Sequence, residues 1–137
     1  MKNLNDIISK LSNLIGDMEE SAKLQYNLSG LTNTQLNYLE TIHLLDNPNI
    51  TELAMALKLS KPTVKIAVDR LIEKDYIFKV RSDKDRRSAH LHLTEKGKLI
   101  NQMHDYAHKR IAEFMSRKLT NEELNTLTSI LDKVLNQ

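Results

Sequence analysis

Apolar residues recur at helical spacing near both ends of the chain. At the N-terminus they repeat at i, i+3, i+4 and i+7, which predicts a long amphipathic helix that ends by Gly30. The same spacing after Thr94 predicts a second long helix that runs through Phe114. In "LTNEEL", Thr120 and Glu123 match a Thr-x-x-Glu capping box, which predicts the start of a last helix. The apolar stripe of that helix consists of Leu124, Leu127, Ile130, Leu131, Val134 and Leu135.

The middle of the chain predicts shorter helices separated by clear stops. In "LTNTQ", Thr32 and Gln35 match another capping box, and the helix that they open is stopped by "DNPN" at 46–49. "TELAMALKL" (51–59) predicts a short helix that ends at a tight break at Leu59-Ser60. Ser60 is a good N-cap for the next helix, and Pro62 falls in its first turn, where a missing N–H costs little.

The helix opened by Ser60 has two different faces. Its apolar face is formed by Val64, Ala67, Val68 and Leu71. Off that face lie Lys61, Thr63, Lys65, Ile66 and Arg70. Two short helices joined in this way predict a helix-turn-helix, in which the second helix can enter a major groove. Short pairs of helices also occur for purely structural reasons, so this pattern alone leaves both interpretations open.

A charged loop between two β-prone segments follows this helix. "YIFKVRS" (76–82) and "SAHLHLT" (88–94) predict a hairpin, and a two-stranded ribbon directly after a recognition helix is a wing. The loop carries Lys84, Arg86 and Arg87, which suit the negative potential of a minor groove. Asp85, two residues before Arg87, can hold and aim that guanidinium. The alternative is a solvated loop with incidental charges.

Charge is segregated along the chain, although the net charge is only +2. Residues 58–98 carry 12 Lys/Arg and 6 Asp/Glu, whereas the remainder carries 8 and 12. A local basic excess is typical of a surface that binds a polyanion, although a solvated basic face without a partner has the same composition.

Composition excludes several classes of protein. The 137 residues fit about one domain, and the absence of cysteine excludes disulfides, thiolate metal sites and cysteine nucleophiles. No apolar run approaches the roughly 20 residues needed to span a bilayer, and the N-terminus has no continuous signal-peptide core, so we expect a cytoplasmic protein with no membrane partner. With three glycines, no phosphate loop and no nucleophile elbow, we expect no enzyme and no cofactor. A module that binds a partner protein through its winged helix is a further alternative.

Three stretches resemble the MarR family of bacterial winged-helix transcription regulators: "LTNTQLNYLETI", "ITELAMALKLSKPTVKIAVDRLIEKDYI" and "DKDRRSAHLHLTEKG". The resemblance implies that Arg87 enters the minor groove with support from Asp85, and that the helix at 61–75 reads the major groove. Asp75 departs from the family pattern, which commonly has Gly there, so the helix end is expected to differ slightly.

The resulting fold class is mainly α with a small β-hairpin wing: a winged helix-turn-helix flanked by N- and C-terminal dimerisation helices. We expect a single domain over 1–137, with a winged-helix lobe at 31–97 and a helical dimerisation region at 1–30 and 98–137. The resemblance implies a homodimer that binds double-stranded DNA as a repressor and is released by a small-molecule effector. Closure of a monomeric core by the terminal helices is the alternative.

His104 and His108 lie at i, i+4, a spacing that two metal ligands can use. A zinc-sensing branch of the same family uses histidines on this helix, which makes a zinc-responsive regulator an alternative. That branch has a further His where this chain has Asn37, and only rearrangement would let Glu19, Glu20 or His43 complete a site. We therefore expect no metal, and we expect His90 and His92, on the outer face of a strand, to lie near DNA or in water.

Overall fold

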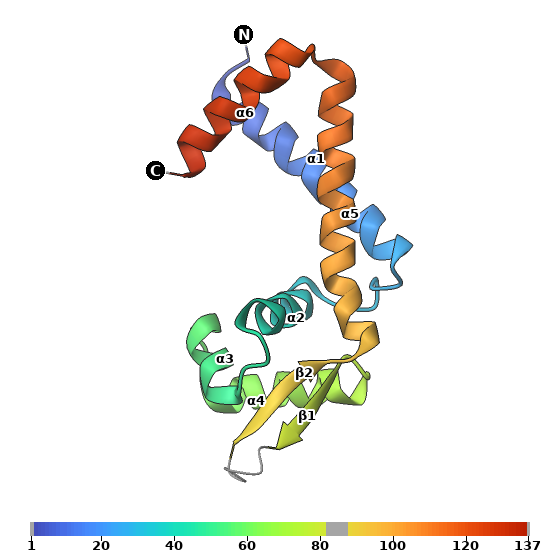
Figure 1. The fold of residues 1–137 in the computed structure, drawn as a ribbon, viewed down its shortest axis with the longest axis vertical. Coiled ribbons are helices and arrows are strands. Elements are labelled where there is room, and N and C mark those ends of the chain that lie inside the picture. The colour runs from blue at the N-terminus through green and yellow to red at the C-terminus, as the bar shows by residue number, and fades with distance from the viewer. Residues whose placement is uncertain (1, 82–87, 137) are drawn as a thin grey trace. The chain divides into compact units, whose positions relative to one another are not determined.

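The computed structural model describes residues 2–81 and 88–136. It contains six helices and one two-stranded antiparallel hairpin within that part of the chain (Figure 1). The elements are α1 (Leu4–Gln25), α2 (Asn33–Leu45), α3 (Ile50–Leu57), α4 (Lys61–Glu73), β1 (Ile77–Arg81), β2 (Ala89–Leu93), α5 (Glu95–Lys118) and α6 (Asn121–Leu135). The expected fold class, a mainly α winged helix-turn-helix, is confirmed.

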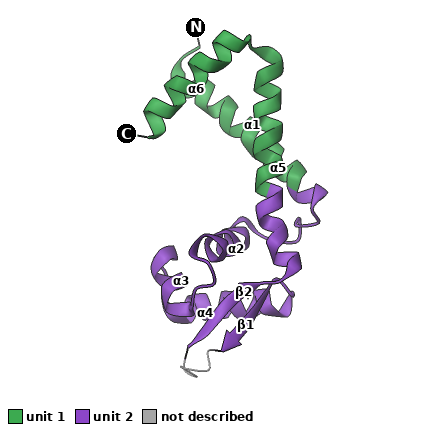
Figure 2. Cartoon of the chain, viewed as in Figure 1, with its two compact units in different colours: residues 1–22, 104–137 green, residues 23–103 purple. Residues whose placement is uncertain are grey.

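The chain divides into two compact units (Figure 2). The central unit, residues 23–103, contains α2, α3, α4, the hairpin and the beginning of α5. The terminal unit, residues 1–22 and 104–137, contains most of α1, the rest of α5 and α6.

The core of the central unit collects the apolar face of every element in it. Leu39 and Ile42 of α2 and Leu53 of α3 are buried, as are Leu71 of α4 and Leu91 of β2. Val64 and Val68 of α4 are also buried, so the face that periodicity assigned to the core is the one that packs, although Ala67 is only half-buried. This packing joins α3 and α4 into a helix-turn-helix and places β1 against α4.

Capping side chains begin the helices where the sequence predicts. At α2 the Thr32 side chain accepts a hydrogen bond from the Gln35 N–H while the Gln35 side chain accepts from the Thr32 N–H, and Thr120 and Glu123 repeat this box at α6. The bond from the Thr120 backbone lowers the pKa of the Glu123 carboxylate. Asn49 caps α3 in the same way and shifts its start to Ile50, one residue before the expected 51.

Left-handed residues end α3 and α4 earlier than the sequence pattern indicates. Lys58 has φ 57° and Leu59 donates back to the Ala54 carbonyl (3.0 Å), which turns the chain directly into α4. At the end of α4, Asp75 adopts φ 66° and Tyr76 donates to the Leu71 carbonyl (2.9 Å). Asp75 therefore takes the conformation that Gly usually supplies, and α4 ends at Glu73 rather than at 75.

The segment Thr94-Glu95-Lys96-Gly97 connects the hairpin to the end of α4 through tight backbone contacts. The Thr94 hydroxyl donates to the Asp75 carbonyl (2.6 Å) and accepts from the Gly97 N–H (3.0 Å), while the Thr94 N–H donates to the Tyr76 carbonyl (3.1 Å). A Cβ at Gly97 would overlap the carbonyl oxygen of Tyr76. Glycine at this position thus allows α5 to begin directly against the residues that follow α4.

The terminal unit buries few side chains of its own. Ala22 and Ala107 are buried, and Arg110 donates a hydrogen bond from Nη1 to the Ser21 hydroxyl (2.9 Å). No residue of α6 is buried over Asn121–Leu135. None of the helices within the described ranges is long and apolar enough to span a bilayer.

Candidate nucleic-acid interface

The start of α4 is fixed by a cap that leaves its first turn free for contacts. Ser60 accepts a hydrogen bond from the Thr63 N–H (3.3 Å) and donates to the Thr63 hydroxyl (2.8 Å). Pro62 occupies the first turn, and no acidic residue is present there. The positive end of the helix dipole and Lys61 therefore lie together at this end of α4.

All seven residues that the sequence predicts for the DNA-contacting surface of α4 and its N-cap are exposed. These residues are Ser60, Lys61, Pro62, Thr63, Lys65, Ile66 and Arg70. The four residues predicted at the wing tip, Lys84, Asp85, Arg86 and Arg87, lie outside the described residues.

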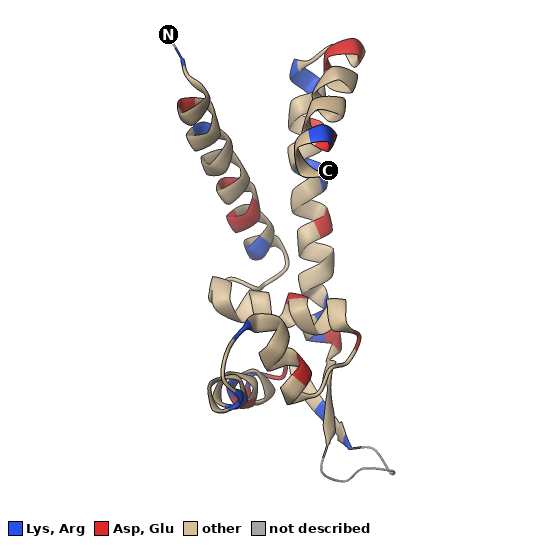
Figure 3. Ribbon diagram, turned by 90° about the vertical axis from the view of Figure 1, so that its left-hand side faces the viewer, with Lys and Arg blue, Asp and Glu red and all other residues tan. Residues whose placement is uncertain are grey.

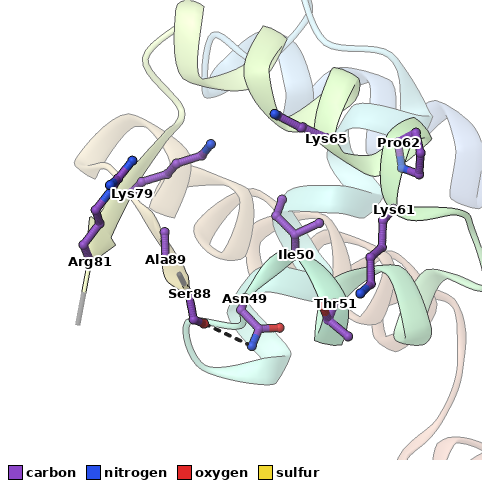
Figure 4. A pocket seen from close by; sticks show the side chains of 10 residues that line it. All are labelled: Asn49, Ile50, Thr51, Lys61, Pro62, Lys65, Lys79, Arg81, Ser88 and Ala89. Atoms are coloured by element: carbon purple, nitrogen blue, oxygen red, sulfur yellow. Dashed lines mark hydrogen bonds between the residues drawn. The ribbon is translucent and has the colours of Figure 1, made fainter. Parts of the chain in front are cut away.

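A cleft of about 750 Å³ lies between α4, β1 and the beginning of α3 (Figure 4). Lys61 and Lys65 of α4 line it together with Lys79 and Arg81 of β1, and we call it the basic cleft. Its other lining residues are Asn49, Ile50, Thr51, Pro62, Ser88 and Ala89. Figure 4 shows the α4 lysines and the β1 cations on different sides of Ile50, which lies between them. The predicted residues Thr63, Ile66 and Arg70 do not line the cleft and lie elsewhere on the exposed part of α4.

Lys79 and Arg81 were not among the predicted site residues. They are two positions apart on β1, so both side chains lie on the same face of the strand as Ile77, which is buried. That alternation could have shown that they share a face, but only the packing of β1 on α4 shows that this face borders α4.

An ion pair connects the two sides of this region. Lys79 Nζ lies 3.8 Å from a carboxylate oxygen of Asp69 on α4. Both side chains remain partly solvated, with exposed fractions of 37% and 50%, so the pair stabilises the fold only slightly. Asp69 offsets part of the positive charge of Lys79.

The loop between α2 and α3 holds the hairpin in register with the helix-turn-helix. The Leu91 N–H donates to the Pro48 carbonyl (2.8 Å), and the His90 Nδ1–H donates to the Asn47 carbonyl (2.9 Å). The amide of Asn49 donates to the Ser88 hydroxyl (3.5 Å), a bond drawn in Figure 4. These three hydrogen bonds fix the position of the start of β2 relative to the α2–α3 loop.

His90 and His92 therefore have packing roles that the sequence did not indicate. His90 hydrogen-bonds the α2–α3 loop, and the His92 ring lies 5.3 Å from the Phe78 ring, across the hairpin. His104 and His108 stack in the terminal unit with ring centroids 6.0 Å apart. Among the residues that the structure describes, no three His, Cys, Asp or Glu are grouped to hold a metal ion.

Basic residues occur on α4 and β1, two of the elements that border the cleft (Figure 3). Lys61, Lys65 and Arg70 belong to α4, and Lys79 and Arg81 belong to β1. Because Lys61, Lys65, Lys79 and Arg81 border one cleft of the central unit, they can contact neighbouring phosphates of one duplex and release the counterions condensed there.

Residues 31–89, which contain α2, α3, α4 and β1, match the model of the MarR family. Over these residues the chain resembles the MarR family. The relatives that the chain matches are HTH-type transcriptional regulators rather than enzymes, in agreement with the expectation from the sequence.

Relatives and solved structures agree with this assignment. The HTH-type transcriptional regulator YpoP of Bacillus subtilis is 33% identical over 87 residues, an alignment that covers 62% of this chain and 60% of YpoP. FabT of Streptococcus pneumoniae, solved in complex with DNA, is 26% identical with a TM-score of 0.69, covering 93% of this chain and 89% of FabT. Wild-type MarR of E. coli, in its apo form, is 21% identical with a TM-score of 0.67 over 98% of each chain, which shows the shared fold.

Proposed function

We propose that this chain is a MarR-family, homodimeric, sequence-specific DNA-binding regulator, and that it acts as a repressor. The observation that carries the proposal is the basic cleft beside the exposed face of α4. Four cations from two elements border one open space there. An enzyme active site is built from a few catalytic groups that converge on one point. A surface that binds a polyanion instead carries several cations side by side. The DNA-bound relative FabT supports the same use of the fold.

In this proposal α4 lies in the major groove and the hairpin follows the adjacent backbone. Lys61, Thr63, Lys65, Ile66 and Arg70 face the groove, with Ser60 and Pro62 at the entry of the helix. Lys79 and Arg81 contact phosphates between the major groove and the wing. At the wing tip, Arg87 enters the minor groove, Asp85 aims it, and Lys84 and Arg86 contact the backbone.

Exposed apolar residues of the terminal unit support a dimer. On α6, Ile130, Leu131, Val134 and Leu135 are all at least 41% exposed, and on α1 so are Leu4, Ile7 and Ile8. Burial of one such side chain contributes about 1.5–3 kcal/mol, so covering several of them favours association strongly. A second copy of this chain covers these faces in the proposed dimer.

The resemblance to the MarR family also supports release from the operator by a small ligand, and a cytoplasmic location.

Selection of binding sites from random duplexes tests the proposal. A two-fold dimer presents two α4 helices, so the recovered sites should be pseudo-palindromic with half-sites roughly 10 bp apart, centre to centre. Recovery of asymmetric sites only, or binding without sequence preference, would contradict it.

A further inference from the structure

Ile66 is an exposed aliphatic side chain in the middle of an otherwise polar helix surface. It is 58% exposed, although most large apolar residues of α4 are buried. Ile is also a weaker helix former than Lys, Gln or Glu, because its branched side chain loses rotamer freedom in a helix. Ile66 therefore contributes little to the stability of the described fold.

The position of Ile66 on the helix directs it away from the core. It lies two residues after Val64 and two residues before Val68, both fully buried, and two residues correspond to about 200° of rotation around the helix axis. Ile66 consequently lies nearly opposite the buried face. Pro62, one turn earlier, is exposed on the same side.

The neighbours of Ile66 are suited to hold the helix against DNA. Lys65 lines the basic cleft, and Thr63 and Arg70 are exposed on the other side of Ile66. Phosphate contacts by such cations position a helix without reading sequence. The residue at the centre of the outward face then lies closest to the base edges.

A major groove presents one apolar group, the 5-methyl group of thymine. An aliphatic side chain without donors or acceptors cannot satisfy the polar edge of G, C or A, and it disfavours those bases by leaving their polar groups without partners. From this chemistry and the placement of Ile66 we propose that Ile66 reads a thymine methyl in each half-site. This inference rests on the proposed DNA-binding function.

Deoxyuridine substitution tests the inference, because deoxyuridine lacks only the methyl group of thymidine. Each thymine of the selected half-site is replaced in turn, and operator affinity is measured for the wild type, for Ile66→Ala and for Lys65→Ala. At one position per half-site, loss of the methyl should weaken the wild type by about fourfold, and by about 15-fold when both half-sites are changed. Ile66→Ala should bind thymine and deoxyuridine operators equally.

Lys65→Ala serves as the matched control on the same helix. It should bind both operators more weakly but keep the full ratio between them, because the contact that Lys65 makes with DNA does not depend on the methyl group that Ile66 contacts. If Ile66→Ala binds too weakly to measure, Ile66→Val replaces it, and a ratio smaller than that of the wild type is expected.

The outcomes separate the inference from the function on which it rests. A wild type that selects no operator contradicts the proposed function. A wild type that selects an operator but shows no methyl dependence, or whose dependence persists unchanged in the Ile66 variants, overturns only the role of Ile66.

Discussion

Arg81→Ala should make DNA binding measurably less sensitive to salt. Arg81 lines the basic cleft from β1 and is exposed. Each cation that contacts a phosphate steepens the slope of log K against log salt by about 0.9. In a homodimer the substitution removes two such contacts, so the slope should become shallower by about 1.8. Lys79 is a less suitable target because Asp69 already offsets part of its charge.

The change in slope predicts a large effect on affinity. Between 50 and 200 mM salt, a slope difference of about 1.8 changes the ratio of wild-type to variant affinity by about 12-fold, with the larger ratio at low salt. Fluorescence anisotropy with the selected operator at four or five salt concentrations measures both slopes. Arg117→Ala is the matched control, because it removes the same charge from an exposed position of α5 in the terminal unit. An unchanged slope for Arg81→Ala, or an equal change for Arg117→Ala, would refute the placement of DNA along β1.

Three further predictions concern the fold, assembly and metal. Gly97→Ala should lower the free energy of unfolding by about 1–3 kcal/mol, because the added Cβ would overlap the backbone. Gly16→Ala in α1, where the Cβ meets open space, should raise it by up to about 1 kcal/mol. Denaturant unfolding measures both variants, and equal effects would contradict the overlap at Gly97. Deletion of residues 120–137 removes the exposed stripe of α6 and should give a monomeric or unfolded protein by sedimentation, so a stable dimer would place the interface elsewhere. Added zinc should change operator affinity by less than about threefold in the wild type and in the His104→Ala/His108→Ala double variant, and a large zinc effect lost in the double variant would favour a metalloregulator.

Periodicity and capping predicted the helices well because both act over a few residues. The boxes at Thr32 and Thr120 are confirmed with their partners Gln35 and Glu123. The same local patterns did not predict the capping box of Asn49 with Glu52, because Pro48 indicates the end of one helix rather than the start of the next. Helix ends were less predictable, because Asp75 adopts a left-handed conformation that its residue type does not demand.

The α4 side of the site was predictable, whereas the β1 side was not. A helix with one apolar face reveals its exposed residues directly, and the structure exposes Lys61, Lys65 and Arg70 as expected. For Lys79 and Arg81 the sequence shows only that they share a strand face. Which element that face meets depends on long-range packing between β1 and α4, and that packing is not encoded in any local pattern.

Lysine acetylation of the full chain, with and without the selected operator, tests the central claim most directly. The exposed lysines of the basic cleft, Lys61, Lys65 and Lys79, should lose most of their reactivity when the operator is bound. The exposed Lys118 and Lys133 of the terminal unit should label equally in both states. Unchanged labelling of the cleft lysines in operator-bound protein, or protection confined to the terminal unit, would contradict a DNA interface formed by α4 and the hairpin.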